Sequence, residues 1–178
     1  MSSTRTIIFV LAFLCGSVVQ PVSAQPVTLD RLLAVVSGHS IMRSDVRAFI
    51  KLGLVDITGA DRAVIDTEEA VLSYLIERRL ILDEVNRYVV PVPPPARIDR
   101  ELAAISRRFD NQDVFDLALE RIGFNENDLR QILVDDVRRE AYLEQRFGNT
   151  LRDDARAQLI ADWVNTLSER RQVVRFDQ

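Results

Sequence analysis

Apolar residues recur at helical spacing along most of the chain, whereas short stretches near its two ends alternate like strands. Residues 32–36 (LLAVV) and 39–42 (HSIM) flank Ser37 and Gly38, and a glycine supplies the positive φ that a tight hairpin turn needs. Residues 172–176 (QVVRF) are β-branched and alternating. Because an isolated strand leaves its backbone groups unpaired, we expect this tail to return and pair with the opening hairpin.

Between these strands, the apolar spacing and the capping residues predict several helices. The first is a short helix that begins at Ser44, its predicted N-cap, with Asp45 in the first turn and Gly53 at its end. A capping-box pattern of Asp66 and Glu69 then opens the longest apolar helix. The later helices are expected over residues 67–89, 96–109, 111–122, 126–147 and 151–170, with a loop over residues 55–65.

The apolar face of each helix indicates which side packs inward. Apolar residues surround more than half of the helix over 67–89, which is typical of a helix with neighbours on several sides. The expected inward residues are Val71, Leu72, Leu75, Ile76, Leu80, Leu82 and Val85, then Ile98, Leu102 and Ile105, then Leu129, Ile132, Leu133, Val137 and Ala141, and finally Leu159, Ile160, Trp163, Val164 and Leu167. We therefore predict a mainly α, multi-helix module with a small antiparallel sheet formed by the N-terminal hairpin and the C-terminal strand.

The first 24 residues have the features of a secretory signal peptide. Arg5 precedes the apolar run of residues 7–14, and small residues before position 25 favour cleavage after Ala24. A membrane anchor is disfavoured because that run falls short of the ~20 residues a span needs. A lipid anchor at Cys15 is disfavoured because the preceding residue is a leucine. The mature chain, residues 25–178, is expected to be a single helical domain without cysteine, held by an ordinary apolar core.

Charge and composition favour neither a nucleic-acid partner nor an enzyme. The formal net charge is −4, and acidic and basic residues are mixed along the chain. The only histidine is His39, so no zinc cluster is predicted, and its place beside the hairpin turn favours a structural role over catalysis. No nucleophile elbow, phosphate loop, dinucleotide fingerprint or calcium loop is present. We therefore expect no metal, no cofactor and no catalytic residue.

Aromatic and large aliphatic residues on the helices leave two interpretations open. They fill the core, or they line a groove that accepts extended apolar segments of another protein. The helices over 67–89 and 126–147 are the expected walls of such a groove. The candidate peptide-binding residues are Phe49, Leu72, Ile76, Phe109, Phe115, Phe124 and Tyr142.

The order of these elements resembles that of SurA-type periplasmic chaperones. The opening LLAVVSGHSIMRSDV is similar to their two short strands, small-residue turn and Ser-Asp helix start, and AVLSYLIERRLILDEVNRYVVPV looks like their long helix. The segments IDRELAAISRRF, ERIGFNENDLRQILVDDVRREAYLEQRF and DWVNTLSERRQVVRF resemble the following helices and the C-terminal helix and strand. The resemblance covers residues 29–176, and it is one of ordered pattern, since no single motif in it is diagnostic.

One departure from this family bears on activity. SurA-type chaperones usually carry parvulin-type prolyl isomerase domains between the last two long helices, whereas Gly148, Asn149 and Thr150 join those helices directly here. The resemblance thus implies a chaperone module without the isomerase. It implies a periplasmic, ATP-independent holdase that binds unfolded or outer-membrane protein segments through an apolar groove.

Two other function classes stay open. A structural or adaptor protein could use the same apolar face to bind one fixed partner or a second copy. Because the C-terminal helix and strand follow a short hinge at Gly148, their exchange between copies would give a homodimer. An enzyme is the third class, which a prolyl isomerase assay on a short peptide would test.

Overall fold

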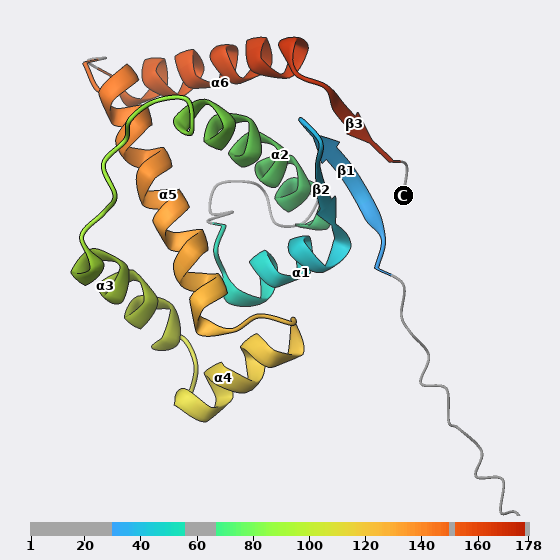
Figure 1. Ribbon diagram of the computed structural model, residues 1–178, viewed down its shortest axis with the longest axis vertical. Helices are drawn as coiled ribbons and strands as arrows, with labels where there is room; N and C mark the ends of the chain where they lie inside the picture. The colour runs from blue at the N-terminus through green and yellow to red at the C-terminus, as the bar shows by residue number, and fades with distance from the viewer. Residues whose placement is uncertain (1–29, 56–66, 150–151, 177–178) are drawn as a thin grey trace, which may run out of the picture.

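Six helices and three short strands form the described part of the computed structural model, which covers residues 30–55, 67–149 and 152–176 (Figure 1). The fold is mainly α with a small antiparallel sheet, which confirms the predicted class. The elements are β1 (Leu32–Val36), β2 (His39–Met42), α1 (Arg43–Leu52), α2 (Thr67–Val85), α3 (Pro95–Ser106), α4 (Gln112–Arg121), α5 (Glu126–Phe147), α6 (Asp153–Arg170) and β3 (Val173–Arg175). The predicted signal peptide and Asp66 of the predicted capping box lie outside the described residues.

The sheet has the order β2-β1-β3, and both of its strand pairs are antiparallel. The β1–β2 hairpin turns through Ser37, with φ 49°, and Gly38, with φ 82°. Two successive residues with positive φ are what a type I′ turn requires, and this turn matches the right-handed twist of the flanking strands. The sequence indicated the glycine, but not that a serine would also adopt the left-handed region.

The C-terminal strand pairs with the opening hairpin, as the sequence predicts. Val174 lies opposite Val35 in the β1–β3 register. At one end of this pairing the backbone N–H of Ser37 donates to the carbonyl of Gln172 (3.0 Å). At the other end the backbone N–H of Phe176 donates to the carbonyl of Leu33 (2.9 Å). Figure 1 shows the consequence, since the first and last described elements lie side by side.

Helix α1 begins one residue before the predicted cap, Ser44. Because β2 runs straight into the helix, Met42 occupies the N-cap position and the Asp45 carboxylate accepts its backbone N–H (2.8 Å). Ser44 donates instead to Asp30, through both its hydroxyl and its backbone N–H. The hydroxyl contact lowers the pKa of the Asp30 carboxyl. A residue outside the helix therefore supplies the anion at its N-terminus.

The other helices match their predicted positions, with shifts at the ends. Helix α5 has the predicted bounds, and its Asn125 and Asp128 side chains form a capping box. Helix α2 ends four residues early, because the chain turns after Val85 before it reaches the prolines. Helix α4 begins one residue later than predicted, because Asn111 caps it by accepting the Val114 N–H (3.0 Å).

The core consists of two apolar clusters. The larger lies among the sheet, α1, α2, α5 and α6, and includes Val36, Phe49, Leu80 and Tyr142. The second lies among α3, α4, α5 and the end of α1, and includes Leu52. All seven predicted inward residues of α2 are buried, and so is Ile81. Helix α2 thus contacts several elements at once, as its wide apolar face predicts.

Two residues predicted to point inward are exposed. Leu159 is 47% exposed because α6 packs along the stripe of Ile160, Val164 and Leu167. Ala141 is exposed because its neighbour Tyr142 occupies the inward face of α5 there. No helix in the described ranges is long and apolar enough to cross a membrane.

Truncation after Arg171 should destabilise the protein, because it removes the strand that joins the two ends of the chain. The loss of Val173 from the core edge and of the β1–β3 hydrogen bonds should cost roughly 2–4 kcal/mol. Urea unfolding followed by circular dichroism measures this change. Removal of residues 177 and 178 alone is the control, and equal stability of the two truncated chains would contradict the expectation.

Candidate functional site

The structure does not bring the seven predicted peptide-binding residues together on one surface. Those in the larger core cluster are Phe49, Leu72, Ile76 and Tyr142. Phe115 lies in the second cluster, and Phe109 and Phe124 pack partly buried against it. Phe49, Leu72, Phe115 and Tyr142 are at most 5% exposed, so most of this set fills the space between helices. Ile76 and Tyr142 also line surface depressions.

A groove of about 500 Å³ lies where α2, α6 and β3 meet. Its apolar lining comes from Ile76 and Leu80 of α2, Val164 of α6 and Val173 of β3. Its polar lining consists of Ser73, Glu77, Asn165, Ser168, Glu169 and Arg175. We call this depression the α2–α6–β3 groove. An apolar floor with a polar rim is the usual form of a site that binds apolar groups from water.

The rim of the groove carries uneven charge. Arg175 donates to the carboxylate of Glu69 and to the hydroxyl of Ser73 (3.1 Å), so its charge is already engaged by α2. Glu77 and Glu169 form no hydrogen bond or ion pair within the described ranges. Burial raises the pKa of the Glu77 carboxyl, with the nearby Arg139 opposing the shift. Among the described residues, the carboxyls of Glu77 and Glu169 therefore form no ion pair, and Arg139 acts on Glu77 only from a longer distance.

A second depression, of about 320 Å³, lies beside the segment that follows α2. Tyr88, Val89, Tyr142 and Arg146 contribute to its lining. Val89 is fully exposed and Tyr88 is 54% exposed. The Tyr88 ring already stacks on Tyr142, with their centroids 5.5 Å apart, and Arg146 lies over the Trp163 ring at 5.0 Å. Because its aromatic faces contact one another, this surface offers less uncovered apolar area than the groove.

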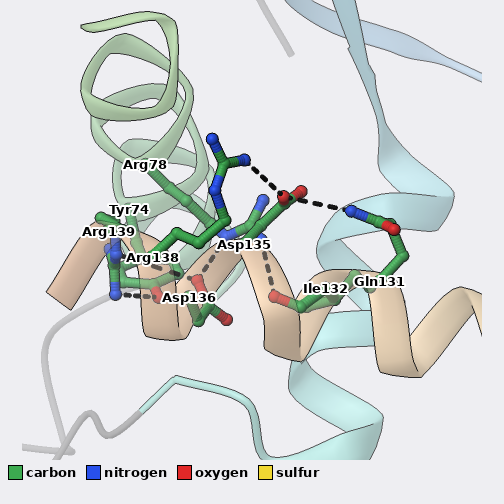
Figure 2. Close-up of polar contacts among 8 residues, drawn as sticks. All are labelled: Tyr74, Arg78, Gln131, Ile132, Asp135, Asp136, Arg138 and Arg139. Atoms are coloured by element: carbon green, nitrogen blue, oxygen red, sulfur yellow. Dashed lines mark hydrogen bonds and ion pairs between the residues drawn. The ribbon is translucent and has the colours of Figure 1, made fainter. Parts of the chain in front are cut away.

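A polar cluster fixes the position of α2, which forms one wall of the groove. Figure 2 shows the side chains of Arg78 and Tyr74 on α2 near Asp136 and Arg139 on α5. Arg78 donates to Asp136 (2.8 Å) and to the carbonyl of Ile132 (3.2 Å), and its side chain is only 12% exposed. Arg139 donates to the Tyr74 hydroxyl (3.0 Å). These contacts join two helices and leave no reactive group facing the groove, so we assign them a structural role.

Desolvation explains the perturbed acid–base behaviour within this α2–α5 polar cluster. Burial raises the pKa of the Tyr74 hydroxyl, and the neighbouring Asp136 carboxylate adds to the shift. The same hydroxyl accepts from Arg139, whose guanidinium also lies over the Tyr74 ring at 5.2 Å. Tyr74 thus stays protonated and acts as a neutral partner between two charged helices.

His39 lies on the exposed surface at the start of β2. Its Nδ1 lies 3.3 Å from the Ser37 carbonyl, and its Nε2 lies 2.8 Å from a guanidinium nitrogen of Arg79. An arginine can only donate, so Nε2 is the acceptor in this contact and Nδ1 is the nitrogen that faces the Ser37 carbonyl. The sequence did not indicate the Arg79 contact, which joins residues 40 positions apart. No group of histidine, cysteine and acidic side chains in the described ranges could hold a metal ion.

Comparisons with known proteins assign no family to this chain. No protein-family model matches it, and a search of curated proteins gave no significant match.

Glu77→Gln should stabilise the protein at neutral pH. The folded-state pKa of Glu77 is raised, so the ionised carboxylate is less stable in the folded protein than in the unfolded chain. This penalty grows as the pH rises through the unfolded-state and then the folded-state pKa, and it vanishes below both. Urea unfolding across this pH range should therefore show an advantage of the glutamine variant that disappears in acid. Glu169→Gln, at an exposed position, is the control, and an equal effect of both changes would contradict the expectation.

Arg78→Ala should cost about 3 kcal/mol of unfolding free energy, because it leaves the mostly buried Asp136 without its closest partner. The double change Arg78→Met with Asp136→Leu should cost less, because it removes both charges. Arg87→Ala, which breaks a pair whose arginine is 64% exposed, should change stability by less than ~0.5 kcal/mol. Thermal and urea unfolding measure all three. A double variant less stable than the single one would refute the assignment.

Proposed function

We propose that this protein is an ATP-independent chaperone of the periplasm that binds unfolded segments of other proteins, outer-membrane proteins among them, through the α2–α6–β3 groove. The observation that carries this proposal is the groove itself, which combines an apolar floor from three elements with a polar rim. Such a surface can shelter apolar side chains while the rest of the client stays in water.

The ordered series of elements adds to the support. The hairpin, the long apolar helix, the capped helix α5 and the returning helix and strand follow the order that resembles SurA-type chaperones. The predicted wall α2 lines the groove, and α6 takes the place of the second predicted wall, α5. The proposal needs no cofactor and no catalytic residue, because holding a client requires only reversible burial of apolar surface.

The charge of the rim favours some clients over others. Glu77 and Glu169 lie beside the apolar floor, whereas the charge of Arg175 is already engaged by Glu69. A segment that carries basic residues among its apolar residues would therefore gain more than one that carries acidic residues among them. This preference distinguishes a groove that receives clients from an apolar face that serves only to pack against a second copy.

The purified mature chain should suppress the aggregation of a denatured β-barrel protein when the two are mixed in equal amounts. Asn165→Trp should weaken this activity by about tenfold in apparent affinity, because the indole would fill the groove at an exposed position of α6. Light scattering after dilution of the client from urea measures the effect.

Gln158→Trp is the matched control. It places the same side chain on an exposed site of α6, two turns earlier and outside the groove lining.

Normal client aggregation in the presence of the unmodified chain would refute the proposal. A stable dimer at all concentrations, with the groove blocked, would favour the adaptor alternative. In the presence of the same preparation, the prolyl bond of a short peptide should isomerise at the rate that it has in buffer alone.

A further inference from the structure

The edge strand of the sheet borders the candidate groove. Strand β3 has β1 as its single strand neighbour in the described part of the chain. Figure 1 shows β3 at the border of the molecule, with β1 on one side and no labelled helix or strand on the other. An edge strand presents unpaired backbone groups, and these are a template for pairing with another chain.

The pairing with β1 fixes which backbone groups face outward. Gln172 and Phe176 bond to β1 through their backbone, as the Ser37 and Leu33 contacts show. In an antiparallel pair these bonds recur at every second residue, so Val174 also faces β1. Val173 and Arg175 therefore direct their N–H and C=O groups away from β1, and within the described ranges these groups have no hydrogen-bond partner.

The same two residues line the α2–α6–β3 groove with their side chains. Val174, between them, points to the opposite face and is 38% exposed. Side chains of paired strands that lie opposite one another share a face of the sheet. A strand added beside β3 would thus place every second side chain in the groove and the others over the face of Val174.

The charges of the groove suit a particular pattern in the added strand. Its floor accepts apolar side chains beside Val173, and its rim holds Glu77 and Glu169 without an ion pair among the described residues. Arg175 brings no competing attraction for acids, because Glu69 already engages it. A lysine or arginine near the α6 side would complete the electrostatic match.

We propose that the groove binds its client as an added β-strand, with the backbone of an extended segment paired to the free edge at Val173 and Arg175. Every second side chain of this segment faces the groove, and these groove-facing side chains are both apolar and basic. This inference rests on the proposed chaperone function and specifies how the client is held. Recognition through the backbone accepts many sequences, whereas the groove selects apolar residues at alternate positions.

The decisive test uses a short synthetic peptide in which every second residue is threonine and the positions between are valine and lysine in turn, so that valine and lysine share one face of the strand. The peptide carries a fluorophore at one end. N-methylation of one alternate set of residues removes the N–H groups that would face β3, whereas methylation of the other set leaves those groups intact. Fluorescence anisotropy with the unmodified mature chain should show about a tenfold or greater loss of affinity for one methylated peptide, and affinity close to that of the parent for the other.

Protein variants test the same edge from the other side. Val173→Pro removes an N–H that faces outward and keeps the pairing to β1, because a proline fits an edge strand when its nitrogen points to solvent. It should lower peptide affinity by about tenfold while the chain stays folded by circular dichroism. Val174→Pro, which removes an N–H that bonds to β1, is the control and should lower the unfolding midpoint instead.

The outcomes separate this inference from the function on which it rests. Equal binding of both methylated peptides would overturn the added strand and leave a client-binding groove intact. Failure of the unmodified chain to bind any peptide or to slow client aggregation would overturn the proposed function itself. A dimer in solution that Val173→Pro abolishes would identify a second copy as the occupant and would also overturn the inference. If that variant does not fold, the methylated peptides alone decide.

Discussion

The antiparallel pairing of β3 with β1 is the contact on which the remaining architecture depends. It joins residues near the two ends of the described chain, so the loop-closure entropy of most of the chain is lost when it forms. The pairing of β3 with β1 also places the end of α6 against α2, and the depression between these two helices is the groove. One short strand thus completes the sheet, closes the core beside Val36 and supplies a wall of the candidate site.

Helix α2 is the second element that constrains the fold, because both its apolar side and its polar side pack against other elements. Its apolar residues contact the sheet, α1 and α6, while its polar side faces α5 through Arg78 and Tyr74. A buried ion pair contributes little net stability compared with apolar packing, but it penalises any rotation of the helix that would separate the charges. The cluster at Asp136 therefore fixes the orientation in which Ile76 and Leu80 face the groove.

The sequence predicted the fold better than the site, for physical reasons. Periodicity indicates which face of a helix is buried, so α2, α3 and α5 followed almost directly from their apolar residues. It does not indicate which helix covers that face. Phe49 and Phe115, predicted to line a groove, are therefore core residues, whereas Asn165 and Glu169, which carry no sequence signal, line the groove. The cap of α1 was misplaced for a related reason, since the hydrogen bonds that Ser44 donates to Asp30 depend on tertiary structure.

The small size of the free edge has a functional consequence if clients bind there. Two outward-facing residues offer only two N–H and two C=O groups, and each hydrogen bond formed in water contributes only about 1 kcal/mol net. Much of this gain is offset by the entropy lost in ordering an unfolded segment. Binding would therefore be weak and rapidly reversible, and a client could leave without ATP. A longer edge would bind more tightly, but it would also pair with other edges of its own kind, so a short strand is consistent with a chaperone that must not aggregate.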